Sequence, residues 1–209
     1  MNVIKYIIFD FDGTLADSKM AFFLTWNQLA EKYKYKKLKI ADYEMLRNLS
    51  MKERSKYADF PMYKLPLFMS DFLKLYRESI TDIHLFAGIK ELLTELEEAG
   101  YQIAIISSNA EKNIRQFLAN NKMNHINDVL CSSRIFGKDK IINKFLKSHK
   151  LQPAEVIYVG DECRDIVACK KAGIKVVWVG WGYDAAEIAQ AENPDYSVYK
   201  PSEILQIIE

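Results

Sequence analysis

The sequence predicts an α/β fold, an open parallel sheet interrupted by a helical insert. Helical patterns separate short, almost continuously apolar runs, and such runs are typical of strands buried on both faces of a parallel sheet. This alternation implies right-handed βαβ crossovers. One stretch, after the first run, breaks the alternation. The four runs are Val3–Phe9, Gln102–Ile106, Glu155–Val159 and Lys175–Val179.

The helices between these runs follow from apolar spacing. Ile89, Leu92, Leu93 and Leu96 stand at positions i, i+3, i+4 and i+7, which places them on one face of a helix that ends near Gly100. The same reasoning predicts three further helices, the last closed by Gly173: Glu111–Asn121, Asp139–His149 and Arg164–Ala172.

The stretch between the first and second runs reads as a helical insert. It carries an amphipathic pattern from Phe22 to Tyr33 and a second helix near Leu67–Ser79, with no clear strand. Pro61 and Pro66 punctuate it. We therefore expect a sheet domain made of residues 1–16 and 86–209, and an inserted domain of residues 17–85.

The composition excludes several classes of protein. The chain has 209 residues, 49% of them hydrophobic, which is enough to form a core. A formal net charge of +1 argues against a duplex-DNA binder that relies on a strong positive field. Three scattered cysteines form no CxxC pair, and no apolar run reaches the ~18 residues of a membrane span. We expect a cytoplasmic protein that binds neither nucleic acid nor membrane.

Carboxylates follow two of the predicted strands. Asp10-Phe11-Asp12-Gly13-Thr14 comes directly after the first run, and Gly160-Asp161-Glu162-Cys163-Arg164-Asp165 comes after the third. Taken alone, the first is equally consistent with an Asx turn and the second with helix capping. However, chemistry in open α/β sheets lies at the carboxyl ends of the strands, so Asp10, Ser107 and Asp161 are expected at one edge.

Two further motifs complete the pattern. Ser107-Ser108-Asn109 opens a helix whose free N–H groups could hold an anion, although, taken alone, an ordinary N-cap is the simpler explanation. Gly137-Lys138-Asp139-Lys140 supplies lysines that could simply be exposed. Together, carboxylates from two strand ends, a hydroxyl at a helix N-terminus and a lysine predict a phosphoryl-transfer site. The all-oxygen ligands select Mg²⁺ rather than zinc.

These four motifs, in this order, resemble those of the haloacid dehalogenase superfamily. The insert resembles the cap of its phosphoglycolate-phosphatase-like subgroup, as do the late segments Trp181-Gly182-Tyr183 and Asn193-Pro194-Asp195-Tyr196. The resemblance implies a Rossmann-like core under a helical cap. It also implies a Mg²⁺-dependent phosphatase that hydrolyses a small, anionic phosphomonoester, such as phosphoglycolate or a sugar phosphate.

The resemblance assigns a role to each motif residue. Asp10 is the expected nucleophile, and Asp12 the acid that protonates the leaving alcohol and the base that later activates water. Asp10, the main-chain carbonyl of Asp12, and Asp161 are expected to hold Mg²⁺. The remaining roles are phosphate binding by Ser107, Ser108 and Asn109, charge compensation by Lys138, and orientation of metal water or of Lys138 by Asp165.

Several alternatives stay open. Lys140 competes with Lys138 as the motif lysine, because Asp139 stands where the family usually has proline. The same core could serve a pyrophosphatase or a nucleotidase. It could also serve a phosphonate hydrolase, with an amine from Lys52, Lys56 or Lys64. An alternative of another class is a non-catalytic module that binds phosphate ligands.

The insert is expected to select the substrate. Arg47, Lys52 and Arg54 are candidates for contacting a carboxylate or second phosphate, although a solvated helix face explains them too. Phe22, Phe23 and Trp26 are expected to form the core of the insert. Residues 19–82 carry thirteen Lys/Arg and eight Asp/Glu, a net +5 that leaves −4 for the rest. This division suits an anionic substrate that enters a carboxylate-rich metal site. The oligomeric state is expected to be monomer or homodimer.

Overall fold

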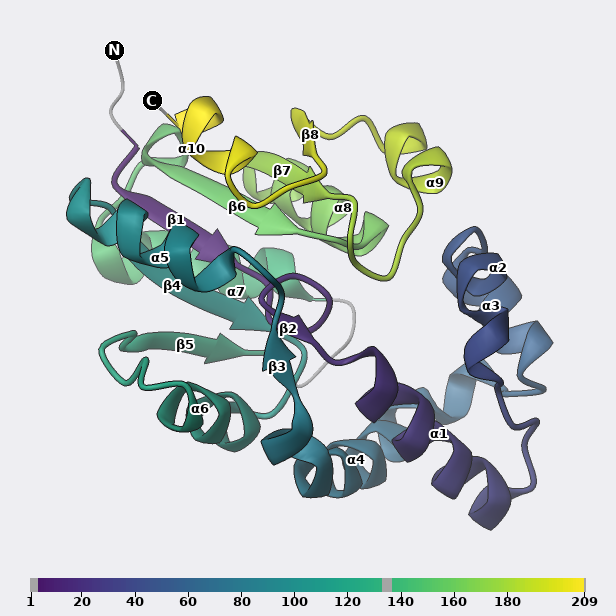
Figure 1. Cartoon of the computed structure of the whole chain (residues 1–209). Coiled ribbons are helices and arrows are strands. Elements are labelled where there is room, and N and C mark those ends of the chain that lie inside the picture. The colour runs from purple at the N-terminus through teal and green to yellow at the C-terminus, as the bar shows by residue number, and fades with distance from the viewer. Residues whose placement is uncertain (1–3, 133–136, 209) are drawn as a thin grey trace.

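The chain forms one parallel six-stranded sheet covered by helices, with a separate helical lobe at one end (Figure 1). The computed structural model describes residues 4–132 and 137–208. The strand order is β5-β4-β1-β6-β7-β8. The strands are β1 (Tyr6–Phe9), β4 (Gln102–Ser107), β5 (Asp128–Cys131), β6 (Val156–Gly160), β7 (Lys175–Val179) and β8 (Tyr196–Val198).

All four predicted strands are present, and they are the four central ones. Val3, in the first predicted run, lies outside the described residues. The analysis of apolar runs missed β5 and β8, which lie at the two edges of the sheet. Edge strands are only partly buried, so they need no continuous apolar run.

Helices cover both faces of the sheet because successive side chains of a strand point to opposite sides. Ile7 and Phe9 of β1 pack with α5, α6 and α10, whereas Ile8 packs with α7 and α8. The predicted helices are confirmed to within a residue or two at their ends. Their bounds are α5 (Ile89–Glu98), α6 (Glu111–Asn120), α7 (Lys138–His149) and α8 (Cys163–Ala172). Two short helices that were not predicted, α9 (Ala186–Ala191) and α10 (Glu203–Ile208), complete the core.

The insert is helical, which confirms the predicted fold class, and we call residues 19–82 the cap. Its helices are α1 (Lys19–Tyr33), α2 (Tyr43–Arg47), α3 (Met51–Tyr57) and α4 (Leu65–Tyr76), joined by the 3₁₀ turns Ile40–Asp42 and Met62–Lys64 and followed by Arg77–Asp82. The expectation of no strand was wrong in detail. β2 (Ala16–Asp17) and β3 (His84–Leu85) pair antiparallel where the chain leaves and re-enters the core. The domain limits at 17 and 85 stay a prediction.

Aromatic side chains pack against one another inside the cap. Phe23 and Trp26 are 4% and 7% exposed, and Phe22 packs beside them, as expected for cap core. Phe68 of α4 contacts both Trp26 and Phe60. In the described part of the chain, no helix combines the length and the apolar character needed to cross a membrane.

Candidate active site

The candidate site lies at the carboxyl ends of three adjacent strands, β4, β1 and β6. Asp10 follows β1, Ser107 ends β4 and Asp161 follows β6. The neighbours of β1 come from distant parts of the chain, one on each side, so the strand order reverses at β1. Ligands of open α/β sheets bind at such a switch point. The structure therefore brings the predicted residues to one edge.

Asp10 forms an ion pair with Lys138. Their Oδ2 and Nζ atoms are 2.6 Å apart, and both side chains are 2% exposed. The other Asp10 oxygen accepts a hydrogen bond of 2.7 Å from the Phe11 N–H. Lys140 is exposed, so the structure brings Lys138 rather than Lys140 to Asp10.

Asp165 is the second partner of Lys138. Its Oδ1 lies 2.5 Å from Nζ, and the side chain is fully buried in the first turn of α8. Burial disfavours the Lys138 ammonium, but the carboxylates of Asp10 and Asp165 outweigh this and raise its pKa above the ordinary value. Lys138 is therefore a fixed cation between two carboxylates.

Asp12 is held by one residue of the core and one of the cap. Asn109 Nδ2 donates to Oδ2 over 2.8 Å, and the Tyr76 hydroxyl donates to Oδ1 over 2.5 Å. Burial raises the pKa of Asp12 above its ordinary value, while both hydrogen bonds act in the opposite direction. A raised carboxyl pKa suits a group that must give and take a proton.

Asp161 is enclosed by backbone and side chains. One carboxylate oxygen accepts from the Thr14 hydroxyl and the other from the Tyr183 N–H, each over 2.7 Å. A Cβ at Gly13 would lie 2.3 Å from Asp161 Oδ2, and one at Gly182 would lie 2.2 Å from the same atom. Glycine at both positions lets the two loops close on this carboxylate.

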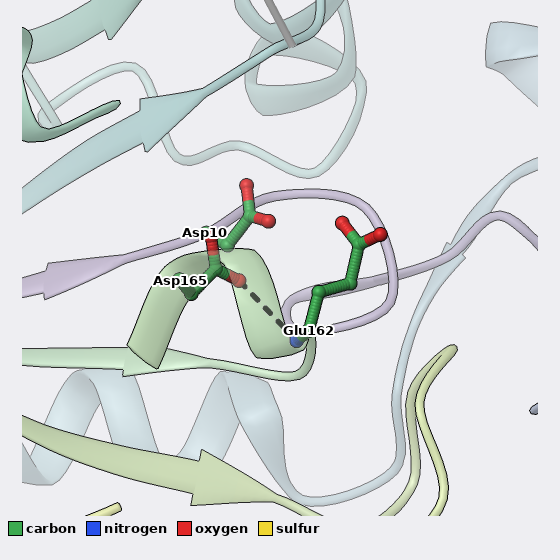
Figure 2. A group of neighbouring side chains, drawn as sticks. All are labelled: Asp10, Glu162 and Asp165. Atoms are coloured by element: carbon green, nitrogen blue, oxygen red, sulfur yellow. Dashed lines mark hydrogen bonds between the residues drawn. The ribbon is translucent and has the colours of Figure 1, made fainter. Parts of the chain in front are cut away.

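Three acidic side chains could share a cation. The ligand atoms of Asp10, Glu162 and Asp165 lie within 4.8 Å of one another, and all three residues are buried (Figure 2). Asp165 Oδ2 also accepts a bond of 3.3 Å from the Glu162 N–H, drawn dashed in Figure 2. Glu162 pairs with Arg164, and Arg164 donates to Ser108 Oγ over 3.0 Å. Asp161 lies outside this group of three.

A cavity of about 240 Å³ connects the core site to the cap. The predicted phosphate-binding residues Ser107, Ser108 and Asn109 line it together with Asp10 and Asp12. Ser107 is 2% exposed, and its Oγ accepts from the Asn109 N–H over 3.2 Å. The predicted catalytic carboxylates therefore share one space with the predicted phosphate binders.

The three basic residues of the cap that were predicted to select the substrate differ in their contacts. Arg47 donates to the Gly180 carbonyl over 2.7 Å, and Arg54 pairs with Asp184 at 2.5 Å, so both join the cap to the same core loop. Both also line the cavity. Lys52 is exposed and outside the described lining. Their role in specificity stays a prediction.

Comparison with known proteins gives the family. The sequence profile of the haloacid dehalogenase-like hydrolases matches residues 7–179. A phosphoglycolate phosphatase of Synechococcus elongatus is 30% identical over 203 residues, which cover 97% of this chain and 96% of that protein. The chain belongs to this family.

More distant similarities fit this assignment. The pyrophosphatase PpaX of Bacillus mycoides is 23% identical, over 98% of this chain and 97% of its own length. A haloacid dehalogenase-like family hydrolase from Streptococcus pneumoniae has the same fold, with a TM-score of 0.82, 23% identity and full coverage of both chains. Our chain is a phosphatase of the phosphoglycolate-phosphatase-like group of haloacid dehalogenase-like hydrolases.

Sequence reasoning missed three residues of this hydrolase's site. Glu162 and Arg164 lie within a motif that was singled out, so their position was a usable signal. Tyr76 had no such signal, because it contacts Asp12 across 64 positions of sequence. Only the packing of α4 against the core brings that hydroxyl to the site.

Proposed function

We propose that this phosphatase hydrolyses a small phosphomonoester with Mg²⁺, through an aspartyl-phosphate on Asp10. One observation carries the proposal. Asp10 is a buried carboxylate at the end of β1, its Oδ2 lies 2.6 Å from Lys138 Nζ, and it shares a cavity with Asp12. A carboxylate in this setting is suited to covalent catalysis.

The reaction has two steps. An Asp10 oxygen attacks phosphorus in line, the bond from phosphorus to the leaving oxygen breaks, and Asp12 gives that oxygen its proton. A water then attacks the aspartyl-phosphate and gives a proton to Asp12, which releases inorganic phosphate and restores Asp10. Tyr76 and Asn109 orient Asp12 in both steps, since each donates to one of its oxygens.

The phosphoryl oxygens need donors on the core side. Ser107, Ser108 and Asn109 supply hydroxyl, amide and backbone N–H groups near the start of α6. Lys138 offsets the charge that builds up on Asp10 and the phosphate. Closure of the cap over these groups excludes water during the transfer.

The charges at the rim suit a divalent cation. Among the described residues, the buried carboxylates here outnumber the buried cations: Asp10, Asp161, Glu162 and Asp165 against Lys138 and Arg164. Burial, together with the neighbouring Glu162 carboxylate, raises the pKa of Asp161 well above its ordinary value. All these donors are oxygens, the ligands that Mg²⁺ prefers.

We propose that Asp10, the Asp12 carbonyl and Asp161 hold the ion. Each Asp161 oxygen already accepts one hydrogen bond but keeps a further lone pair. Glu162 lies close enough to Asp10 to orient water on the ion, while Asp165 holds Lys138 beside Asp10. When bound, Mg²⁺ would reduce the repulsion between Asp10 and an anionic phosphate.

A pyrophosphatase is the second candidate, because a relative of that activity matches almost the whole chain. A phosphonate hydrolase needs a cap amine near the substrate. Lys52, Lys56 and Lys64 are all exposed and outside the described cavity lining, which disfavours it. A cytoplasmic location, a monomeric or dimeric state and the absence of nucleic-acid partners stay predictions.

A panel of phosphomonoesters and pyrophosphate, assayed with Mg²⁺, tests the proposed function. We expect hydrolysis that disappears in Asp10→Asn and with EDTA, because the nucleophile or the cation is lost. Asp17→Asn is the matched control, since Asp17 is exposed on β2. Activity that survives both Asp10→Asn and EDTA would contradict the mechanism, and no activity on the whole panel would favour a binding module.

A further inference from the structure

The cap half of the cavity is apolar. Six of its lining residues are Phe or Trp: Phe22, Phe23, Trp26, Phe60, Phe68 and Phe72. Leucine and methionine side chains from α2, α3 and α4 complete this part of the wall. The cavity runs without interruption from these side chains to Asp10 and Asp12. A group attached to the phosphate would therefore enter an aromatic chamber.

The polar side chains of the chamber already have protein partners. The Tyr43 hydroxyl donates to the Gly182 carbonyl, Ser55 to the Phe60 carbonyl, and Tyr76 to Asp12. Arg54 is paired with Asp184. These groups hold the cap together and join it to the core, which leaves few donors for a polar substrate.

Among the described residues that line the cavity, Arg47 is the one with a buried polar atom that lacks a hydrogen-bond partner. Its guanidinium is bound to the Gly180 carbonyl and to Glu44, but its buried Nε finds no hydrogen-bond partner among the described residues. A single N–H offers one hydrogen bond to an ether or carbonyl oxygen. It can bind one carboxylate oxygen, but a buried carboxylate needs several donors to replace its hydration.

We propose that the leaving group of the natural phosphomonoester is apolar, an alkyl or aryl group that occupies this aromatic chamber. The inference rests on the proposed function, since it places the phosphate at Asp10. The available space is far larger than the ~10–15 Å³ that one water requires. An apolar group that packs against these side chains is removed from water together with the apolar surface it covers, and this transfer is favourable.

A homologous series of esters tests the chamber. Methyl, propyl and hexyl phosphate are assayed with Mg²⁺ beside phosphoglycolate. We expect kcat/KM to rise about fourfold for each methylene, the equivalent of ~0.8 kcal/mol per buried CH₂, until the chamber is full. Phosphoglycolate should be the poorer substrate, because its carboxylate loses hydration among phenyl rings.

A pair of variants at Met69 sharpens the test. Met69 lies on α4, is only partly buried and lines the cavity, so it tolerates exchange better than the buried rings. Met69→Lys should lower kcat/KM for hexyl phosphate at least tenfold and raise it for phosphoglycolate. Met69→Leu keeps the wall apolar and should leave the order of substrates unchanged. Thermal unfolding checks that both variants are folded.

Binding separates this inference from the phosphatase proposal. Hexylphosphonate and methylphosphonate, which are not hydrolysed, are titrated calorimetrically into the protein with Mg²⁺. We expect tighter binding of the hexyl compound and a more negative heat-capacity change. If the hexyl compound binds more tightly but no ester is hydrolysed, the proposed phosphatase function is contradicted, and the apolar binding site in the cap is supported. Turnover without dependence on chain length, or with phosphoglycolate preferred, would overturn the apolar leaving group.

Discussion

The two halves of the cavity differ in chemistry. On the core side, Asp10 and Asp12 line the cavity, and ion pairs and hydrogen bonds of 2.5–2.8 Å fix them and the buried groups next to them. On the cap side, the wall is mostly aromatic and aliphatic. The difference indicates a division of labour, in which the core carries out the transfer and the cap decides what is attached to the phosphate. Substitutions on the core side should therefore lower the rate of the reaction, whereas substitutions on the cap side should change which substrates are accepted.

The largest loss of activity and stability is expected at Lys138, which pairs with Asp10 beneath the core half of the cavity. Lys138→Met leaves Asp10 and Asp165 buried without their shared cation. Breaking a buried ion pair in this way costs ~3–5 kcal/mol of unfolding free energy, and kcat should fall at least ~100-fold as the charge near the phosphate is lost. Urea unfolding and steady-state kinetics measure the two effects.

Lys140→Met is the matched control for this change. Lys140 is two residues away on the same helix but exposed, so its unfolding free energy should stay within ~0.5 kcal/mol of the parent. If the two variants had equal kinetics, Lys138 would have no special place in the reaction.

A smaller loss of activity is expected at Tyr76, the cap residue whose hydroxyl contacts Asp12 in the core. Tyr76→Phe removes the hydrogen bond to Asp12 and should lower kcat about tenfold with little change in KM, as expected for a hydrogen bond to a charged group. The loss should be greatest for alkyl phosphates and small for p-nitrophenyl phosphate, whose leaving group needs no proton. Kinetics on both esters measure this.

Tyr63→Phe serves as the control for Tyr76, since Tyr63 is 80% exposed on the cap. Equal losses on good and poor leaving groups in Tyr76→Phe would point to a structural role. The hydroxyl of Tyr76 would then not act through Asp12.

The smallest effect is expected at Arg47, on the cap side. Its guanidinium holds the cap to the Gly180 carbonyl, so Arg47→Ala should raise KM about threefold for an acidic and a neutral ester alike, the loss of one net hydrogen bond. Lys52→Ala, an exposed change on α3, should leave both values unchanged. A rise for phosphoglycolate alone would show that Arg47 recognises a carboxylate.

The sequence predicted the core half better than the cap half. Its motifs are local: Asp10 and Asp12 follow a buried strand directly, and Lys138 begins a helix. Parallel strands bring such ends together, so spacing along the chain was enough. The Tyr76 contact with Asp12 depends on how α4 packs, which no spacing encodes.

The composition of the cap does not show where its charged side chains point. Its net charge of +5 suggested basic residues that meet an anionic substrate. In the structure Lys52, Lys56 and Lys64 face solvent, while Arg47 and Arg54 bind core carbonyls and Asp184. Some of the basic side chains of the cap are therefore solvated, and others join the cap to the core. The direction in which each side chain points determines which of the two it does.

The short β2–β3 ladder brings the two ends of the cap together, so that the cap occupies the place of a single turn between two paired strands. Asp17 pairs with His84 and Ala16 with Leu85, antiparallel, and the Phe86 N–H bonds to the Leu15 carbonyl over 3.0 Å. Two antiparallel residues so paired can be joined by a two-residue turn such as Asn-Gly. The core chain could thus close into a plain hairpin at this point, and any helical module whose ends lie equally close could be exchanged there.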